Sequence, residues 1–200
     1  PEFFTACDHV GISLVERDRI RTPVATSKQL RELDEAQYGM GEGPCREAIR
    51  EHATVMVHDL ATDPRWPSWG RAMVDQLGIR SSISFRLFTR PDRTWGALNV
   101  YATQPCAFTH EDVLQGQTIA ALAAVALARS INDDQLVRAI ESRTVIGQAV
   151  GMLMERYGLD EDRAFNVLRR LSSHDNVKLR DLAAQVVATR ELPDHDTPGA

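Results

Sequence analysis

The chain is poor in cysteine, and the few that it has form no recognisable pattern. Cys7, Cys45 and Cys106 are odd in number, far apart and outside any C-x-x-C arrangement. A disulfide framework needs paired cysteines, and a structural zinc site needs closely spaced thiolates. The sequence indicates neither, so we expect three reduced thiols.

An excess of positive charge is also missing. The 200 residues include 23 Lys and Arg against 28 Asp and Glu, with a net charge of -5 and an isoelectric point near 5.7. Proteins that bind polyanions mainly through charge are usually strongly basic. Any nucleic-acid site in this chain must therefore be local.

No apolar run is long enough to predict a membrane span. The longest, Ile119 to Ala128, has ten residues and ends at Arg129, whereas a helix needs about 20 to cross the hydrocarbon layer. Glu2 stands where a secretory signal would carry Lys or Arg, and no cleavage pattern follows an apolar core. We therefore expect a cytoplasmic protein that does not enter a membrane.

Catalytic and metal-binding motifs are absent from the sequence as well. The six histidines form no i, i+4 pair and no H-E-x-x-H motif, so we expect no metal. No Ser-His-Asp motif, paired carboxylates or cofactor fingerprint occurs. We therefore expect neither an enzyme nor a bound cofactor.

Two pairs of β-prone runs are present. His9 to Glu16 and Arg19 to Thr26 predict a hairpin, in which Pro23 suits an edge strand because it lacks a ladder donor. Ser82 to Thr89 and Gly96 to Tyr101 predict a second hairpin. The first 108 residues thus supply at least five strands when the strand at 53–57 is included.

The segment between the hairpins mixes short helices with loops. Gln29 to Tyr38 leads into Gly39 to Pro44, whose glycines and proline predict a loop. Cys45 to Glu51 is predicted to be a short helix, Ala53 to Val57 a buried strand and Asp59 to Trp69 a loop. The expected fold class of the chain is α+β.

A long helix is predicted to follow. Thr109 is an N-cap with Asp112 at the capping-box position. From Glu111 to Tyr157 there is no proline, so one helix, or two nearly continuous ones, can run some 45 residues. The polar stretch 130–142 predicts a coiled-coil neck between a domain at 1–129 and a domain at 143–192.

Three amphipathic helices predict a small bundle in the second domain. The first carries apolar residues at steps of three and four up to Tyr157. Asp160 is predicted to cap a second helix, whose apolar face includes Phe165, and Asn176 to cap a third. Residues 193–200 are predicted to be a disordered tail.

The sequence of this bundle resembles a known family. The segment 142–158 reads SRTVIGQAVGMLMERYG, and two further motifs follow it: Ala164-Phe165-x-x-Leu168-Arg169 and Asn176-x-Lys178-Leu179-x-Asp181-x-Ala183. These motifs resemble an ANTAR domain, the RNA-binding module of bacterial transcription antitermination regulators. The resemblance implies a three-helix bundle at the end of a coiled coil, which binds RNA hairpins as a dimer. Val150 departs from the family pattern, since many members carry Lys there, and this removes a possible phosphate contact.

The first 130 or so residues resemble a GAF domain, of the kind that precedes ANTAR domains. The motifs that carry this match are Gly41-x-Gly43-Pro44-Cys45, Asp59-Leu60, Arg65-Trp66-Pro67, Gly78-x-Arg80-Ser81 and Gly96 to Tyr101. The resemblance implies a sensor with a GAF-like antiparallel sheet flanked by helices, a long connecting helix and a C-terminal three-helix bundle. It does not identify a ligand.

The resemblance and the chemistry of RNA recognition together select eight residues. Basic side chains bind phosphates, while unpaired bases are recognised by stacking and hydrogen bonds. The predicted RNA-binding set is Arg143, Gln148, Arg169, Arg170, Ser173, Asn176, Lys178 and Arg180. Between Arg143 and Arg190 there are eight cations and six carboxylates, a net charge of about +2, so we expect modest affinity per module. On composition alone these arginines would simply be solvated, and Asn176 would only cap a helix.

Candidates for a ligand site in the GAF-like domain are weaker. Cys45 follows a glycine-rich turn at a helix start, where the dipole can make a thiol reactive, although a buried inert cysteine is the commoner case. Trp66 and Trp69 can line a pocket or pin their loop. Gly41 and Gly43 lack the context of a phosphate-binding motif, so turn geometry explains them better.

Three functions compete at this stage. The first is a signal-gated RNA-binding antitermination regulator, a homodimer joined through the long helix, with RNA hairpins as partner and a small molecule as candidate ligand of the GAF-like domain. The second is a sensor whose bundle docks a protein partner instead of RNA. The third is an enzyme, because some GAF-like domains reduce methionine sulfoxide with clustered cysteines, but the three cysteines here are scattered. We expect the first.

Overall fold

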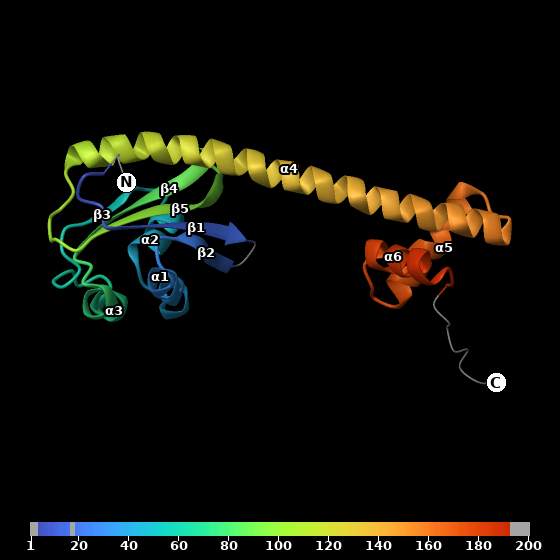
Figure 1. Ribbon diagram of the computed structural model, residues 1–200, viewed down its shortest axis with the longest axis horizontal. Coiled ribbons are helices and arrows are strands. Elements are labelled where there is room, and N and C mark those ends of the chain that lie inside the picture. Colours follow the sequence, from blue (N-terminus) through green and yellow to red (C-terminus); the bar gives the residue numbers. More distant parts are fainter. Residues whose placement is uncertain (1–3, 17–18, 193–200) are drawn as a thin grey trace. The chain divides into compact units, whose positions relative to one another are not determined.

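A computed structural model of the chain describes residues 4–16 and 19–192. The chain divides into two compact units, Pro1–Ser130 and Ile131–Ala200, and one long helix contributes to both (Figure 1). Each unit has its own hydrophobic core.

The first unit is built on a five-stranded antiparallel sheet. Its strands are β1 (His9–Glu16), β2 (Arg19–Ala25), β3 (Val55–Val57), β4 (Ser81–Arg90) and β5 (Arg93–Ala102), in the sheet order β2-β1-β5-β4-β3. The two predicted hairpins, β1–β2 and β4–β5, are confirmed, and Pro23 lies in the edge strand β2. The turn predicted at Arg17-Asp18 lies outside the described residues.

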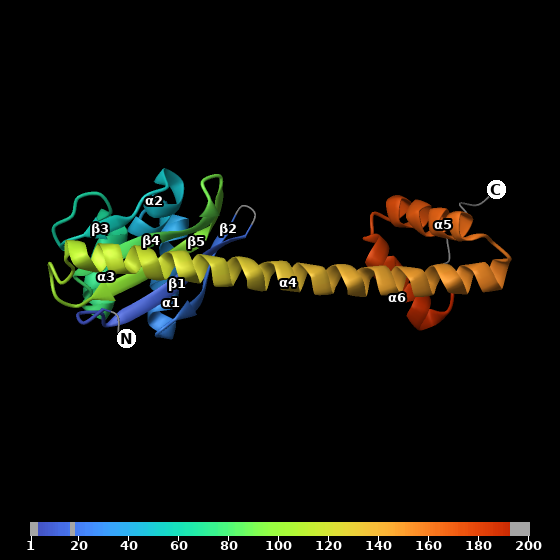
Figure 2. The same cartoon turned by 90° about the horizontal axis from the view of Figure 1, so that it is seen from above.

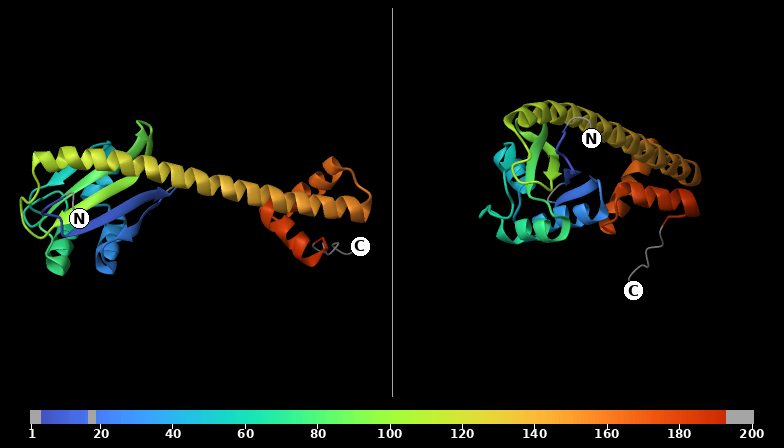
Figure 3. Two further views of the ribbon diagram at one scale, coloured as in Figure 1. Left: turned by 45° about the horizontal axis from the view of Figure 1, so that its top comes forward. Right: turned by 60° about the vertical axis from the view of Figure 1, so that its left-hand side comes forward.

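Alternation along the strands gives this sheet two different faces. In β4 the apolar Ile83 and Phe85 alternate with Ser82 and Ser84. The first part of the long helix α4 (His110–Tyr157) covers the apolar face, where Gly116 lies against the ring of Phe85. Three shorter helices cover the other face (Figures 1 and 3): α1 (Lys28–Met40), α2 (Pro44–Glu51) and α3 (Pro67–Leu77).

Two loop predictions in this unit are wrong at their edges. α1 continues through Met40 and ends at Gly41 with a left-handed φ of 73°, because a glycine in that conformation terminates a helix well. α3 begins at Pro67, so Trp69 is helical, because proline fits the first turn of a helix, where its missing N–H is not needed.

α4 (His110–Tyr157) is one continuous helix of 48 residues. Its predicted start is confirmed, because the Asp112 N–H donates to Thr109 Oγ1 (3.3 Å) and the Thr109 N–H donates to the Asp112 carboxylate (2.7 Å). By length and composition α4 also meets the criteria for a membrane span, which counting consecutive apolar residues had not predicted. Only 17% of that apolar window is buried within the described chain.

The second unit is a three-helix bundle in which α5 (Glu161–His174) and α6 (Leu179–Thr189) pack with the last turns of α4 (Figure 2). Its core is formed by Ala149, Val150, Leu153, Ala164, Leu168, Leu182, Ala183 and Val186. The predicted cap of α5 is confirmed, because the Arg163 N–H donates to Asp160 Oδ1 at 2.8 Å.

Three predictions for the bundle are wrong. Tyr157 and Phe165, which the pattern placed on apolar core faces, are 49% and 37% exposed, because each lies at the edge of the buried stripe of its helix. Asn176 does not cap α6: Lys178 occupies the cap position, while Asn176 has a left-handed φ of 53° in the turn, a conformation that asparagine tolerates. The predicted tail at 193–200 lies outside the described residues.

Candidate functional site

Six of the eight predicted RNA-binding residues gather where α5 ends and α6 begins. We call this surface the basic corner, and it consists of Arg169, Arg170, Ser173, Asn176, Lys178 and Arg180. All six are exposed. The neighbouring Leu168 and Leu182 are buried in the core, so the amphipathic pattern of the two helices turns the polar residues outward.

The turn between the two helices holds the basic corner in one conformation. Ser172 Oγ donates to the carbonyl of Val177 at 2.7 Å, and the Val177 N–H donates back to the carbonyl of Ser172 at 3.1 Å. Arg180 pairs with Asp181 at 3.1 Å, but both side chains are about half exposed, so this ion pair contributes little. The corner therefore presents cations on a fixed turn.

The other two predicted residues lie on α4, in two different grooves. Arg143 lines a groove of about 590 Å³ between α4 and α5, together with Leu179 at the start of α6. Gln148 lines a groove of about 850 Å³ between α4 and α6. Arg143 thus shares a groove with Leu179, which stands between Lys178 and Arg180 in the sequence, whereas Gln148 lines the other groove.

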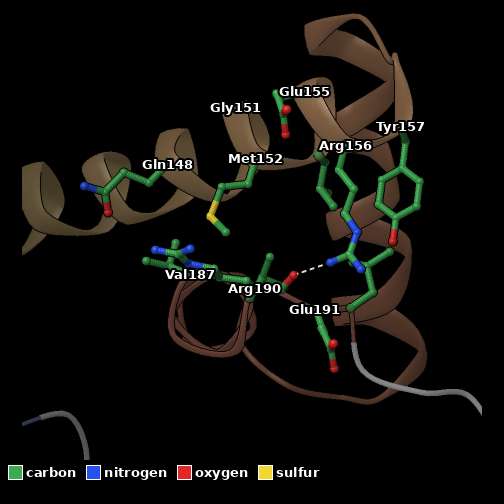
Figure 4. Close-up of a pocket in the computed structure, with 12 residues that line it drawn as sticks. Gln148, Gly151, Met152, Glu155, Arg156, Tyr157, Val187, Arg190 and Glu191 are labelled. Carbon is green, nitrogen blue, oxygen red and sulfur yellow. Dashed lines mark hydrogen bonds between the residues drawn. The ribbon is translucent and has the colours of Figure 1, made fainter.

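The groove between α4 and α6 contains residues that the sequence did not single out. Arg156 donates a hydrogen bond to the backbone carbonyl of Arg190, which closes one end of the groove (Figure 4). The Arg156 guanidinium lies 5.8 Å from the centre of the exposed Tyr157 ring. Glu155 and Glu191 also line the groove, so its charge is mixed. A flat guanidinium beside an aromatic ring offers stacking surface, and the adjacent Arg156-Tyr157 pair was the available sequence signal.

Val150 lies in the core of the bundle and is only 7% exposed. It belongs to the same cluster as Leu153 and Leu168. At the position where many members of the ANTAR family carry Lys, this chain therefore has a packing residue.

A buried polar network occupies the space between the sheet and α1 in the first unit. Tyr101 donates a hydrogen bond to the carboxylate of Asp34, and Gln37 and Asn99 donate to the same carboxylate at 3.1 Å and 3.4 Å. Asn99 also donates to Ser13 Oγ at 3.0 Å. Gly11 makes room for this network, because a Cβ at that position would lie 2.6 Å from Asp34 Oδ2.

Burial controls the protonation of the network. It raises the pKa of Asp34 from 3.8 to about 7, although the hydrogen bonds from Tyr101, Asn99 and Gln37 oppose the shift. No cation contributes to this pKa. Burial likewise raises the pKa of the Cys45 thiol to about 11. The network therefore contains a carboxyl group that changes its charge near neutral pH.

Several polar atoms of this interior have no hydrogen-bond partner among the described residues. They are Gln37 Oε1, Asn99 Oδ1, Ser82 Oγ and Ser84 Oγ. An unpaired buried polar group costs about 1–3 kcal/mol, so such groups usually have a bound partner such as water or a ligand. This interior is thus a polar site with unused hydrogen-bonding capacity.

The three weak ligand candidates are all packed into the first unit. Trp69 is fully buried and its Nε1–H donates to the carbonyl of Leu33 at 2.9 Å. Trp66 is 6% exposed, and the Arg65 guanidinium lies 4.1 Å from its ring centre. Cys45 is fully buried and lies 3.6 Å from the hydroxyl of Tyr38. The rings support the core, and the thiol lies beside the polar network without being accessible.

Side chains that could ligate a metal are dispersed over the structure. Within 4–16 and 19–192, no group of three or more His, Cys, Asp or Glu side chains is arranged to hold a metal ion.

Fold and site together define a class of protein: an α+β domain joined by a continuous helix to a three-helix bundle with a basic corner. A GAF domain family model matches residues 2–128, and an ANTAR domain model matches residues 134–187. Because the GAF match covers more than half of the chain, the chain belongs to the GAF domain family and carries an ANTAR domain behind it. This is the general architecture of signal-regulated, RNA-binding antitermination regulators.

Solved structures share the fold of the first unit. A type II free methionine-R-sulfoxide reductase from Thermoplasma acidophilum is 19% identical with a TM-score of 0.53, over 64% of this chain and 84% of that chain. The GAF domain region of a Geobacter sulfurreducens protein, described as a membrane protein, is 19% identical with a TM-score of 0.51, over 62% and 82% of the two chains. At these identities the likeness shows the fold alone. A comparison with curated proteins found no match.

Proposed function

We propose that the chain is a non-enzymatic, cytoplasmic regulator of transcription antitermination that binds RNA hairpins through its ANTAR domain under the control of its GAF domain. The observation that carries this proposal is the basic corner. It is exposed, it lies in the ANTAR domain, and three of its residues, Arg169, Asn176 and Lys178, match the motifs of that family.

The chemistry of the basic corner suits a folded RNA. Its four cations can neutralise backbone phosphates, and Ser173 and Asn176 can hydrogen-bond to bases or to 2′-hydroxyl groups. Because the bundle has few cations in excess and Val150 is buried, the affinity of one module is expected to be modest. Two modules in a homodimer, joined through α4, would raise the affinity for tandem hairpins by avidity.

The GAF domain supplies the signal in this proposal. The signal in this proposal is a small molecule, and the polar interior around Asp34 makes that domain chemically suited to respond to it. A non-enzymatic role is supported by Cys7 and Cys45, because both are buried and burial raises the pKa of both thiols.

A gel shift with tandem terminator-proximal hairpins tests the RNA proposal. Substitution Arg169→Ala/Lys178→Ala is expected to weaken binding about tenfold. It should also lower the slope of log affinity against log salt by about two, because fewer counterions are released from the RNA when two phosphate contacts are missing. The matched control is Arg31→Ala/Arg71→Ala, which removes two exposed arginines from the GAF domain. Equal binding by both double variants would remove the basic corner from the proposal.

A protein-docking function is the second candidate. The groove between α4 and α5 favours it, because Met154 and Phe165 are 36% and 37% exposed there. A folded wild-type chain that binds no hairpin at low salt, with or without cell-extract metabolites, would support docking of a protein in place of RNA.

A further inference from the structure

A pocket of about 700 Å³ lies in the first unit, beside the part of β4 that follows its pairing with β3. β3 is an edge strand of the sheet and pairs only with residues 82–84 of β4. Beyond this point, the turn at residues 52–54 and the adjoining part of α4 form the walls of the pocket. The described residues that line it include none of the polar network around Asp34, so the two sites are separate. Its volume is in the usual range for a small-molecule site.

Arg86 is the only Lys, Arg, Asp or Glu among the described residues that line the pocket, and it is only 8% exposed. Its Nε donates a hydrogen bond to Thr94 Oγ1, and its Nη2 donates one to the carbonyl of Pro91, both at 2.7 Å. Both acceptors are neutral. Within residues 4–16 and 19–192, Arg86 forms no ion pair and its Nη1 donates no hydrogen bond. Because a buried charge without a counter-charge is costly, this guanidinium is suited to an anionic ligand.

The rest of the lining is mainly apolar. Phe85 is buried there, whereas Phe88 and Val125 are 47% and 63% exposed. The Arg86 guanidinium lies 4.6 Å from the centre of the Phe88 ring, so the charge adjoins an exposed aromatic surface. One positive group beside an apolar surface is the arrangement expected for the binding of an anion with an apolar body.

The surrounding hairpin also favours an anion. Arg90 and Arg93 are Cα partners on β4 and β5, and both are exposed. Like charges directly opposite each other on two strands repel, and neither arginine forms an ion pair within the described residues. Asp92 is the only carboxylate in the sequence 81–102. The approach to the pocket is therefore positively charged and attracts anions.

We propose that this pocket binds a small monocarboxylate with an apolar body. The carboxylate accepts hydrogen bonds from Arg86, and the body lies against Phe88 and Val125. A single carboxylate fits better than a phosphate group, because Arg86 supplies one charge and has one nitrogen without an acceptor, whereas a phosphate needs several donors. Val125 belongs to α4, so the ligand contacts the helix that continues into the RNA module. The inference rests on the proposed function, since it gives the small-molecule signal of the GAF domain a site and a chemical class.

Calorimetric titration of the full chain with octanoate and with octanol tests the role of the charge. Octanoate is expected to bind about tenfold more tightly, because octanol has the same chain but offers no carboxylate to Arg86. Arg86→Gln should weaken octanoate binding about tenfold and leave octanol binding unchanged. Arg93→Gln is the matched control, because Arg93 lies 4.1 Å from the ring centre of Trp95 on the same hairpin but does not line the pocket. Equal affinity of the wild type for octanoate and octanol would overturn the inference.

A second variant tests the pocket from α4, because Arg86→Gln also removes two hydrogen bonds that hold the hairpin. Ala121 is exposed and lines the pocket, so Ala121→Trp should fill the space and weaken the binding of octanoate and octanol alike. Ala126→Trp is its control, since Ala126 is an exposed alanine of α4 outside the pocket. Circular dichroism checks that each variant is folded. Unchanged octanoate binding by a folded Ala121→Trp chain would show that the ligand lies elsewhere.

Two-dimensional NMR of the full chain locates the ligand. Octanoate is expected to shift the Nε–H signal of Arg86 and the backbone amide signals of Phe88 and Gln117. Shifts centred on Asp34 and Tyr101 would place the ligand in the polar network and overturn the inference. The gel shift with RNA hairpins is measured without octanoate. A chain that binds the hairpins but not octanoate would therefore overturn this inference alone, whereas a chain that binds octanoate but no RNA would overturn the RNA proposal alone.

Discussion

Asp34 is a carboxyl group in the interior of the GAF domain with no cation beside it. Tyr101, Gln37 and Asn99 stabilise its charged form by hydrogen bonds, yet burial outweighs them and raises its pKa to about 7. Asp59 behaves in the opposite way, because a hydrogen bond from Arg80 lowers its pKa. One residue thus links the charge of this interior to pH in the neutral range.

This raised pKa gives a signed prediction for stability. Between about pH 4 and 7 the folded state holds a proton on Asp34 that the unfolded state releases, so stability is full below about pH 4 and falls as the pH rises to 7. A shift of this size corresponds to at most about 4 kcal/mol. Asp34→Asn is expected to remove this slope and to gain stability relative to the wild type above pH 7.

Urea unfolding followed by tryptophan fluorescence measures the effect, because Trp66, Trp69 and Trp95 all lie in the first unit. The pKa of Asp59 is lowered, so its contribution to stability is lost only below about pH 4 and does not affect the slope between pH 4 and 7. Asp75→Asn, which neutralises an exposed carboxylate, is the control. If wild type and Asp34→Asn lose stability in parallel between pH 4 and 7, Asp34 is not the titrating group.

Within the elements, glycines on α4 show how one helix meets different surroundings. A methyl group at Gly116 would overlap the ring of Phe85, which is itself only 1% exposed and cannot move aside. A methyl group at Gly147 would have open space around it. Apart from the backbone of its own helix and the two adjacent residues, no atom of the described chain lies within 4 Å. Gly116 therefore serves close packing of helix and sheet, while Gly147 only weakens its helix.

The same substitution at these two glycines is expected to have opposite effects. Gly147→Ala should stabilise the chain by about 1 kcal/mol, because alanine is the better helix former. Gly116→Ala should destabilise the GAF domain by about 1–2 kcal/mol, because overpacking against Phe85 exceeds the gain in helix propensity. Thermal unfolding of both variants measures the two signs, and a stabilising Gly116→Ala would show that α4 does not pack tightly on the sheet.

Elements that begin with a local signal could be predicted from the sequence. The starts of α4 and α5 follow from Thr109 and Asp160, since each cap is a contact over three residues. The width of a buried stripe could not be predicted in this way, and Phe165 is exposed for that reason. The spacing of apolar residues shows which side of a helix faces the core, but it does not show how much of that side the neighbouring helix covers.

The candidate sites also differ in whether local sequence patterns could predict them. The basic corner comes from one short segment, so its residues are neighbours whatever the tertiary fold. Asp34 and Tyr101 are 67 positions apart, and no spacing rule connects them. The groove near Arg156 and Arg190 likewise exists only because α6 packs with the end of α4. Contacts of this kind depend on tertiary packing, which local patterns do not encode.

At the scale of the whole molecule, α4 belongs to both the sensing domain and the RNA module. It starts against the sheet at Gly116 and ends in the core of the bundle at Leu153, without a break in the helix. If α4 pairs with a second copy, as the proposed homodimer requires, the number of RNA modules held together is set by α4 and not by the modules themselves. RNA affinity and dimerisation then become separable properties of one chain.

Separating them gives the last prediction. Leu136→Asp/Ile140→Asp places charges among apolar side chains of α4 that are 62% and 56% exposed, so it should break the proposed dimer while leaving both cores intact. Affinity for a single hairpin should stay within about twofold of the wild type, because no residue of the basic corner changes. Affinity for tandem hairpins should fall about 100-fold, since linking two modest sites contributes that much avidity. Titrating both RNAs against both proteins measures the four constants. If the wild type binds tandem and single hairpins equally well, two modules do not act together, and the dimer has some purpose other than RNA avidity.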